Sequence, residues 1–230
     1  MLTVEFISVA LSISLSTAYR SVAQLCKAGF LDRVSSNGYA LGSAFIHYDY
    51  VLRQKDPLIQ AAKPVMALLL SQTLQSATVI LCKRYRDCIM CVHEEHGKEQ
   101  HLPASYERGM EMPIFLGATS KVILAHLPDR ILKKTYLNHE STIQATTNVH
   151  HWKDFKNQLN LIKKQGYAQT ESEVTNNITG IAAPIIRDDK IIGGVSLVFS
   201  IGNTKQRKAA EQFPPHVIAA GQRISANLNQ

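Results

Sequence analysis

The stretch STAYRSVAQLCKAGFL, from Ser16 to Leu31, has the pattern of a short amphipathic helix followed by a stop signal. Apolar or small residues recur there at three-and-four spacing, which places them on one face of a helix. Those residues are Leu15, Ala18, Tyr19, Val22, Leu25 and Gly29. Ser14 is a suitable N-cap, and Gly29 is a typical residue just past a helix end. We therefore predict a helix over residues 14–28 with one dry face.

The opposite face of this predicted helix is polar and carries no acid. Its residues are Ser16, Thr17, Arg20, Gln24 and Lys27. Hydroxyl, amide and cationic side chains of this kind can hydrogen-bond to phosphates and to base edges. The pattern therefore indicates a helix that can enter a DNA groove.

The residues on either side extend the pattern. Thr3 can cap a helix over VEFISVAL, and only Ser12 and Ile13 separate the two helices, which is typical of a helix-turn-helix. After them, residues 31–34 and 39–41 flank Asn37-Gly38, whose positive φ angles favour a tight hairpin turn. Helix, turn, helix and two-stranded wing predict a winged helix-turn-helix. The alternative is an amphipathic helical hairpin with a packing role only.

Composition limits the remaining classes. The chain has 230 residues, 45% of them apolar and 19% charged, which is ordinary for one large globular domain or two modest ones. The net charge of +7 agrees with an acidic partner but does not identify one. Residues 1–55 hold five Lys or Arg and three Asp or Glu, a net of +2, so they form no polybasic arm.

Targeting signals are weak. No apolar run approaches the roughly 18 residues that a membrane span needs, and four cysteines do not suggest a disulfide framework. The first sixteen residues resemble a signal peptide, but Glu5 stands where positive charge is needed and no Lys or Arg precedes Arg20. We expect a cytoplasmic protein with reduced thiols.

The rest of the chain alternates helices with antiparallel strands. A helical segment from Ser43 to about Tyr50 is broken by RQKDP, and Asp56-Pro57 begins a new helix, so a domain boundary is expected near residue 55. Strand patterns follow in SATVILCKR, CIMCVH, GIAAPII and KIIGGVSLVF, and helical patterns in ATSKVILAHL, HWKDFKNQLNLIKKQGY and PPHVIAAGQRISANL. The order predicts an α+β domain.

Taken together, these segments resemble the IclR-type transcriptional regulators over nearly the whole chain. The resemblance is carried by the N-terminal helices with NGYALG, by MPIFLGATSKVILAHLP, and by the stretch from LIKKQGYAQTESEV to IIGGVSLVF. It implies an α+β protein with a winged helix-turn-helix DNA-binding domain over residues 1–42, a linker helix over 43–55 and a GAF/PAS-like antiparallel-sheet effector domain over 56–230. It also implies a homodimer, or a tetramer, that binds operator DNA as a repressor or activator.

The chain departs from the family pattern at its start. Family members usually carry a further helix before LTVEFI, and it completes the three-helix core of the winged domain. We therefore expect the apolar face of residues 4–11 to lack a packing partner, at a cost of a few kcal/mol for each aliphatic side chain left unburied.

For DNA, the predicted contacts lie on the second helix and the wing. They are Ser16, Thr17, Tyr19, Arg20, Gln24, Lys27, Arg33 and Asn37. Arg20 can read guanine with two hydrogen bonds, and the hydroxyls at the helix N-terminus favour a phosphate. Tyr19 can instead pack on the apolar face, and each of these residues can also be a solvated surface residue.

For a small-molecule effector, the resemblance implies a pocket built from three segments. The candidate residues are Met112, Ala118, Thr119, Thr170, Gly180 and Ser196. Family members often have an acid where Thr170 stands and a serine where Val198 stands, so this pocket favours a carboxylate with a more apolar body. The alternative is that Ser196 and Thr170 only satisfy local backbone groups. Glu173 matches a common family acid, for which a structural role is favoured over one in the pocket.

The segment CIMCVHEEH, residues 88–96, looks like a metal site. On a strand, however, Cys88 and Cys91 point to opposite faces and cannot share one ion, so two cysteines packed as small hydrophobes are expected. We expect no cofactor, no metal, no enzymatic activity and no membrane partner. The predicted function is a DNA-binding regulator controlled by a small organic acid. The alternatives are a small-molecule sensor that has lost DNA binding, and a metal-dependent enzyme built on residues 88–96.

Overall fold

The structure is a computed structural model and describes residues 2–74, 76–98, 107–147, 149–201 and 210–229. The chain divides into two compact units, Met1–Asp56 and Pro57–Gln230. Each unit has its own hydrophobic core.

The first unit begins with the two predicted helices, α1 (Val4–Ala10) and α2 (Leu15–Lys27). The Thr3 hydroxyl accepts a hydrogen bond from the Phe6 N–H, and the Ser14 hydroxyl accepts one from the Thr17 N–H, both at 3.2 Å. Gly29 has a φ of +75° directly after the helix end. The helix bounds, both caps and the glycine stop are confirmed, because local hydrogen bonding and backbone freedom determine them.

The predicted wing is present as β1 (Leu31–Arg33) and β2 (Tyr39–Leu41), which pair antiparallel. The expected tight turn at Asn37-Gly38 is wrong, because neither residue has a positive φ. A five-residue loop, 34–38, joins the strands instead. Arg33 closes that loop by donating to the carbonyl oxygens of Ser35 and Ser36.

Helix α3 (Ala44–Lys55) is longer than the residue pattern predicted, and it spans nearly all of the segment 43–55 that the family resemblance implied as a linker helix. The expected break at RQKDP is wrong, since Arg53, Gln54 and Lys55 continue the helix. Arg53 pairs with Asp49 one turn earlier at 2.7 Å, which supports the helical turn at this point. The helix ends at Asp56, where the following Pro57 disfavours helical backbone.

The core of the first unit is small. It consists of Val4, Ala18, Val22 and Leu31, with partly buried neighbours. The expectation that the apolar face of residues 4–11 lacks a packing partner holds only in part. Val4 is buried and Ile7 packs against this core, whereas Val9 and Leu11 are 80% and 65% exposed. Tyr19 and Leu25 on α2 are also exposed, so the dry face of α2 is narrower than predicted.

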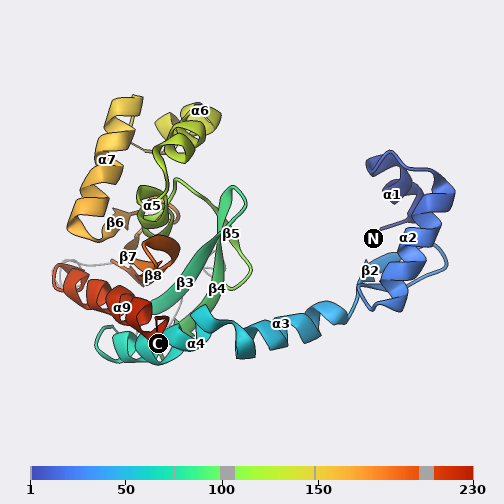
Figure 1. Cartoon of the computed structure of the whole chain (residues 1–230), viewed down its shortest axis with the longest axis horizontal. Coiled ribbons are helices and arrows are strands. Elements are labelled where there is room, and N and C mark those ends of the chain that lie inside the picture. Colours follow the sequence, from blue (N-terminus) through green and yellow to red (C-terminus); the bar gives the residue numbers. More distant parts are fainter. Residues whose placement is uncertain (1, 75, 99–106, 148, 202–209, 230) are drawn as a thin grey trace. The chain divides into compact units, whose positions relative to one another are not determined.

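The second unit is built on a six-stranded antiparallel sheet (Figure 1) in the order β5-β4-β3-β8-β7-β6. Its strands are β3 (Thr78–Tyr85), β4 (Cys88–His96), β5 (Glu111–Pro113), β6 (Ala168–Glu171), β7 (Ile178–Arg187) and β8 (Lys190–Ser200). The four long strands and the turn at Asp188-Asp189, where both φ angles are positive, were predicted from the sequence. The α+β class is confirmed. The short edge strands β5 and β6 were not predicted.

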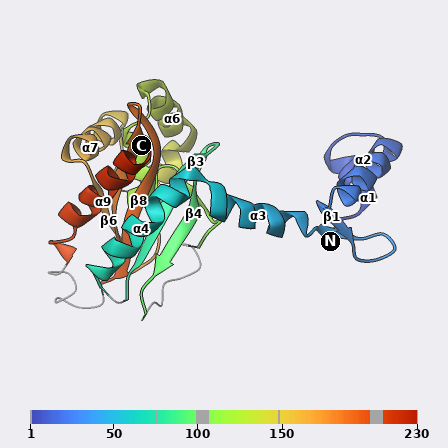
Figure 2. The ribbon, with the colours of Figure 1, turned by 60° about the horizontal axis from the view of Figure 1, so that its bottom comes forward.

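Helices cover both faces of this sheet. On one face lie α4 (Pro57–Ser71) and α9 (Pro214–Asn227) (Figure 2), and on the other lie α5 (Ala118–Ala125), α6 (Asp129–Thr146) and α7 (Trp152–Gln165). The sequence did not predict α6. This helix is polar, and its backbone leaves helical geometry at His139. Within the described ranges no single helix is long and apolar enough to cross a membrane, although α1 and α2, bent by 115°, pass that test as a pair.

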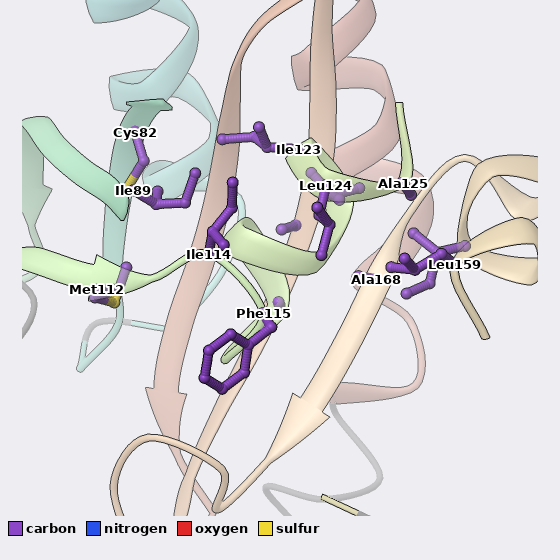
Figure 3. Close-up of a cluster of buried hydrophobic side chains, with 14 of the residues drawn as sticks. Cys82, Ile89, Met112, Ile114, Phe115, Ile123, Leu124, Ala125, Leu159 and Ala168 are labelled. Carbon is purple, nitrogen blue, oxygen red and sulfur yellow. The ribbon is translucent and has the colours of Figure 1, made fainter. Parts of the chain in front are cut away.

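The helical layers explain why the central strands have few polar residues. On β8, Val195, Leu197 and Phe199 belong to the core under α4 and α9, whereas Val198 belongs to the core under α5. Figure 3 shows the core under α5. There Ile123, Leu124 and Ala125 of α5 lie near Leu159 of α7 and Ala168 of β6. A strand buried on both faces needs apolar residues at nearly every position.

Candidate ligand cavity and candidate nucleic-acid interface

Strand register brings the predicted pocket residues together. Ser196 of β8 lies opposite Ile80 of β3 and Ala182 of β7, and Gly180 lies opposite both Val198 and Thr170. Directly paired residues share a face of the sheet. The side chains of these two rows therefore point toward the same helical layer, which contains α5.

Gly180 allows α5 to approach the sheet closely. A Cβ atom added at this glycine would lie 3.4 Å from the Ala118 Cβ, and 3.8 Å from the hydroxyl oxygens of both Ser196 and Thr170. The absence of a side chain at Gly180 therefore leaves space between two hydroxyl groups and the first turn of α5.

This space is part of a narrow cavity: the centre of a water molecule can reach only about 20 Å³ of it, and its empty space of about 340 Å³ includes open solvent. All six residues that the sequence singled out for an effector line it: Met112, Ala118, Thr119, Thr170, Gly180 and Ser196. The sequence analysis missed Ile80, Gly117, Val174 and Ile178. Ile80 could have been found from strand alternation, but the loop before Ile178 has no periodic pattern.

Among the residues that line the cavity, Ser196 has a buried hydroxyl group without a hydrogen-bond partner. Its side chain is 1% exposed, and its hydroxyl has no hydrogen-bond partner within the described structure. Burying a hydroxyl without a partner costs roughly 1–3 kcal/mol. Because Ser196 lines the cavity, a polar ligand atom in the cavity can supply the missing hydrogen bond.

Glu173 holds the first turn of α5 at the edge of the cavity. Its Oε2 accepts a hydrogen bond from the Gly117 N–H at 3.1 Å, and its Oε1 pairs with the Lys121 ammonium. Glu173 makes the structural contacts that were favoured, but it also lines the cavity, so its two predicted roles do not exclude each other. The N–H groups of Ala118 and Thr119 lie in the same first turn, where backbone donors have no partners within the helix.

The candidate nucleic-acid interface is the polar face of α2. Ser16, Tyr19, Arg20, Gln24 and Lys27 are exposed, while Thr17 is half-buried and hydrogen-bonded to Ser14 at 2.8 Å. Ala18 and Val22 on the other face are buried against α1 and Leu31. Neither Arg20 nor Lys27 is turned inward.

The two predicted wing residues differ in their surroundings. Asn37 is exposed in the loop. The guanidinium of Arg33 is exposed as well, but two of its nitrogens donate to the wing's own carbonyl groups. Arg33 therefore shapes the wing, and it has fewer donors left for a phosphate than Arg20.

The CIMCVHEEH segment forms the long strand β4. Cys91 is buried directly opposite Cys82 of β3, whereas Cys88 is half-exposed and donates its thiol hydrogen to the Tyr85 carbonyl. No three His, Cys, Asp or Glu side chains in the described segments of the chain are grouped as metal ligands would be.

Comparison with known proteins gives a consistent family. The model of the bacterial transcriptional regulator IclR C-terminal family matches residues 51–226. A curated relative, the "Probable HTH-type transcriptional regulator ArcR" of Halobacterium salinarum, is 24% identical over 99% of this chain and 87% of its own length.

Two solved structures share the fold over nearly the whole chain. The IclR of Thermotoga maritima has a TM-score of 0.72 at 23% identity and covers 100% of this chain and 92% of its own. An IclR homolog of Microbacterium hydrocarbonoxydans, solved in complex with 4-hydroxybenzoate, has a TM-score of 0.77 at 20% identity, covering 98% of this chain and 90% of its own.

Proposed function

Because the chain belongs to the IclR family of bacterial transcriptional regulators, we propose that it binds operator DNA and is controlled by a small organic acid. In this proposal residues 1–42 bind DNA, residues 43–55 form a linker helix, and residues 56–230 bind the effector. The chain works in the cytoplasm as a homodimer or tetramer, and it needs neither a cofactor nor catalysis.

The observation that carries the effector half of the proposal is the convergence of six residues on one cavity with an unpartnered buried hydroxyl. A carboxylate can accept hydrogen bonds from the N–H groups of the first turn of α5, where the helix dipole also favours an anion. The Ser196 hydroxyl can donate to the same group. One ligand end is therefore anionic.

The remaining cavity wall favours an apolar ligand body. Ile80, Ile178 and Val198 line it, and Glu173 is already paired with Lys121. A second carboxylate on the ligand would meet the Glu173 carboxylate or apolar side chains, and neither compensates its charge. An aromatic or branched aliphatic monocarboxylate fits this description, and 4-hydroxybenzoate, the ligand of the Microbacterium homolog, belongs to the class.

The DNA half of the proposal rests on α2, which exposes Arg20 and Lys27 and has no acidic residue. A dimer would present two such helices to half-sites in successive major grooves. The test is a fluorescence-anisotropy titration with the promoter region upstream of the chain's own gene. We expect Arg20→Ala to lose about 1–3 kcal/mol of specific binding, which is about 5- to 150-fold in affinity.

Arg187→Ala serves as the control for this titration, since it removes the same charge from the β7–β8 hairpin of the second unit. Unchanged affinity and base preference in Arg20→Ala would show that α2 is not the recognition helix. If the wild-type chain binds no DNA even at low salt but is stabilised by monocarboxylates in a thermal-shift assay, it is a sensor without DNA binding.

A further inference from the structure

A second hollow lies between the β3–β4 hairpin, Ile114 and α6. It contains about 630 Å³ of empty space, open solvent included. None of its lining residues lines the first cavity. Its polar lining consists of Arg84, Asp87, Arg130, Lys134, Thr135, Asn138 and His139.

The charge of this hollow is strongly one-sided. Three cationic side chains face one carboxylate, that of Asp87, which lies 3.5 Å from Arg84. Arg130 and Lys134 are exposed and form no ion pair with any residue that the structure describes. Two full positive charges are therefore available for an outside anion.

Helix geometry explains why these donors face the same way. Arg130, Lys134 and Asn138 are spaced four residues apart on α6, so they lie on one face of the helix. The helix leaves regular geometry at His139, whose φ is −129°. The His139 imidazole packs on Phe115, with ring centroids 5.1 Å apart, and it also lines the hollow.

We propose that this hollow binds a small phosphorylated metabolite. A phosphate monoester carries nearly two negative charges and three acceptor oxygens, which suits a guanidinium and an ammonium one helical turn apart. The Asn138 amide can add a further donor, and Ile114 and Ile131 can contact the carbon part of the ligand. A concave site suits a small molecule better than the extended backbone of a nucleic acid.

Some residues that line the hollow and the first cavity are neighbours in the sequence. Figure 3 shows Ile114 and Phe115 on the segment between Met112 and α5. Ile114 lines the hollow, while Met112, Gly117 and Ala118 line the first cavity. The five-residue connection 113–117 thus contributes to both linings, with Ile114 in the hollow and Gly117 in the first cavity.

The test is isothermal titration calorimetry of the full-length chain with 3-phosphoglycerate, and with inorganic phosphate as a second probe. We expect one saturable site per chain for 3-phosphoglycerate and weaker binding of inorganic phosphate. Arg130→Gln combined with Lys134→Gln should lower the affinity at least about tenfold, because both charge-assisted hydrogen bonds are lost. Both side chains are exposed, so the melting temperature of the double variant should match that of the wild type.

The matched control is Lys153→Gln combined with Lys164→Gln, which removes the same charge from exposed positions of α7. If this control variant binds 3-phosphoglycerate within about twofold of the wild-type affinity, the result supports the site, because a general charge effect would weaken both double variants equally. An equal loss in the two double variants, or no saturable heat with either probe, would overturn the proposal. If the α6 variant instead loses affinity for a random DNA duplex while the wild type ignores 3-phosphoglycerate, the face contacts nucleic acid and the proposal is wrong.

Discussion

Lys121 and Glu173, 52 residues apart in the chain, form an ion pair that ties the first turn of α5 to the loop after β6. The Lys121 side chain is only 5% exposed and that of Glu173 is 20% exposed. Because Glu173 also accepts from the Gly117 N–H, one carboxylate connects two segments that line the cavity. The shape of the cavity therefore depends on this pair.

Removing the lysine should destabilise the second unit. In Lys121→Met the Glu173 carboxylate keeps one hydrogen bond but loses its cation, and breaking a largely buried pair on one side costs about 3 kcal/mol. Urea unfolding followed by the fluorescence of Trp152, the single tryptophan, measures the change within this unit. The double variant Lys121→Met/Glu173→Gln should recover part of the loss, because no unpaired charge remains. A double variant as unstable as the sum of both single variants would contradict this.

Ser196→Ala should weaken ligand binding without destabilising the fold. The hydroxyl has no partner in the described structure, so deleting it removes no internal hydrogen bond and relieves a burial cost of roughly 1–3 kcal/mol. We expect the ligand-free variant to be as stable as the wild type or more stable. Affinity for a monocarboxylate such as 4-hydroxybenzoate should fall about 5- to 10-fold, the value of one hydrogen bond. Calorimetric titration of both proteins gives the comparison. A clear loss of stability without ligand would mean that the hydroxyl has an internal partner.

Gly180→Ala should block the cavity by filling it. The added Cβ meets its neighbours at 3.4–3.8 Å, which is ordinary van der Waals contact, so the fold should tolerate it. We expect the loss of measurable ligand binding together with a melting temperature equal to or above that of the wild type. Retained affinity would place the ligand elsewhere.

Gly221→Ala should be destabilising, although alanine normally stabilises a helix interior by about 1 kcal/mol relative to glycine. On α9 the new Cβ would lie 2.7 Å from the Pro184 carbonyl oxygen and 3.0 Å from the Ala183 Cβ, so α9 must move away from β7. We expect a cost of about 1–3 kcal/mol in urea unfolding. The neighbouring exposed position provides the control, since Gln222→Ala should stay within about 0.5 kcal/mol.

The stability of the second unit should fall on mild acidification because of His126. Burial lowers the pKa of this imidazole from its usual 6.5, and the nearby Lys163 charge lowers it further, although its hydrogen bond to the Val122 carbonyl opposes the shift. The unfolded chain therefore binds a proton at His126 more readily than the native protein. The stabilising contribution is present above about pH 6.5 and is lost as the pH falls toward the lower native value.

Unfolding of the wild type and of His126→Gln over this pH range isolates the effect. The difference between their free energies of unfolding should shrink as the pH falls below about 6.5, because the protonated wild type loses its advantage. A difference that does not vary with pH would show that His126 does not titrate differently in the native and unfolded states.

Local signals in the sequence predicted much of this structure. Ser14, Gly29 and the near-continuous apolar runs of β3, β7 and β8 act through nearest neighbours, and the corresponding elements are where the sequence placed them. The wing turn was predicted wrongly because the hydrogen bonds of Arg33 to the loop outweigh the turn preference of Asn37-Gly38. Helix α6 was missed because its apolar positions are few and its backbone kinks at His139.

The six cavity residues came from the family resemblance and not from periodicity. Their meeting depends on the register between β6, β7 and β8, which no local pattern specifies. The second hollow could not be predicted from the sequence for the same reason. Arg84 and Arg130 are 46 positions apart, and only the packing of α6 beside the β3–β4 hairpin brings them together.

The pairing of Cys82 with Cys91 gives the sheet an internal reporter. These two thiols face each other across β3 and β4, and a hydrogen bond between them together with burial raises the pKa of Cys82. A thiol-specific dye should therefore label the half-exposed Cys26 and Cys88 at once and the inner two only when the ladder opens. The rate at which Cys82 and Cys91 are labelled would report how often β3 and β4 separate locally, without any engineered probe.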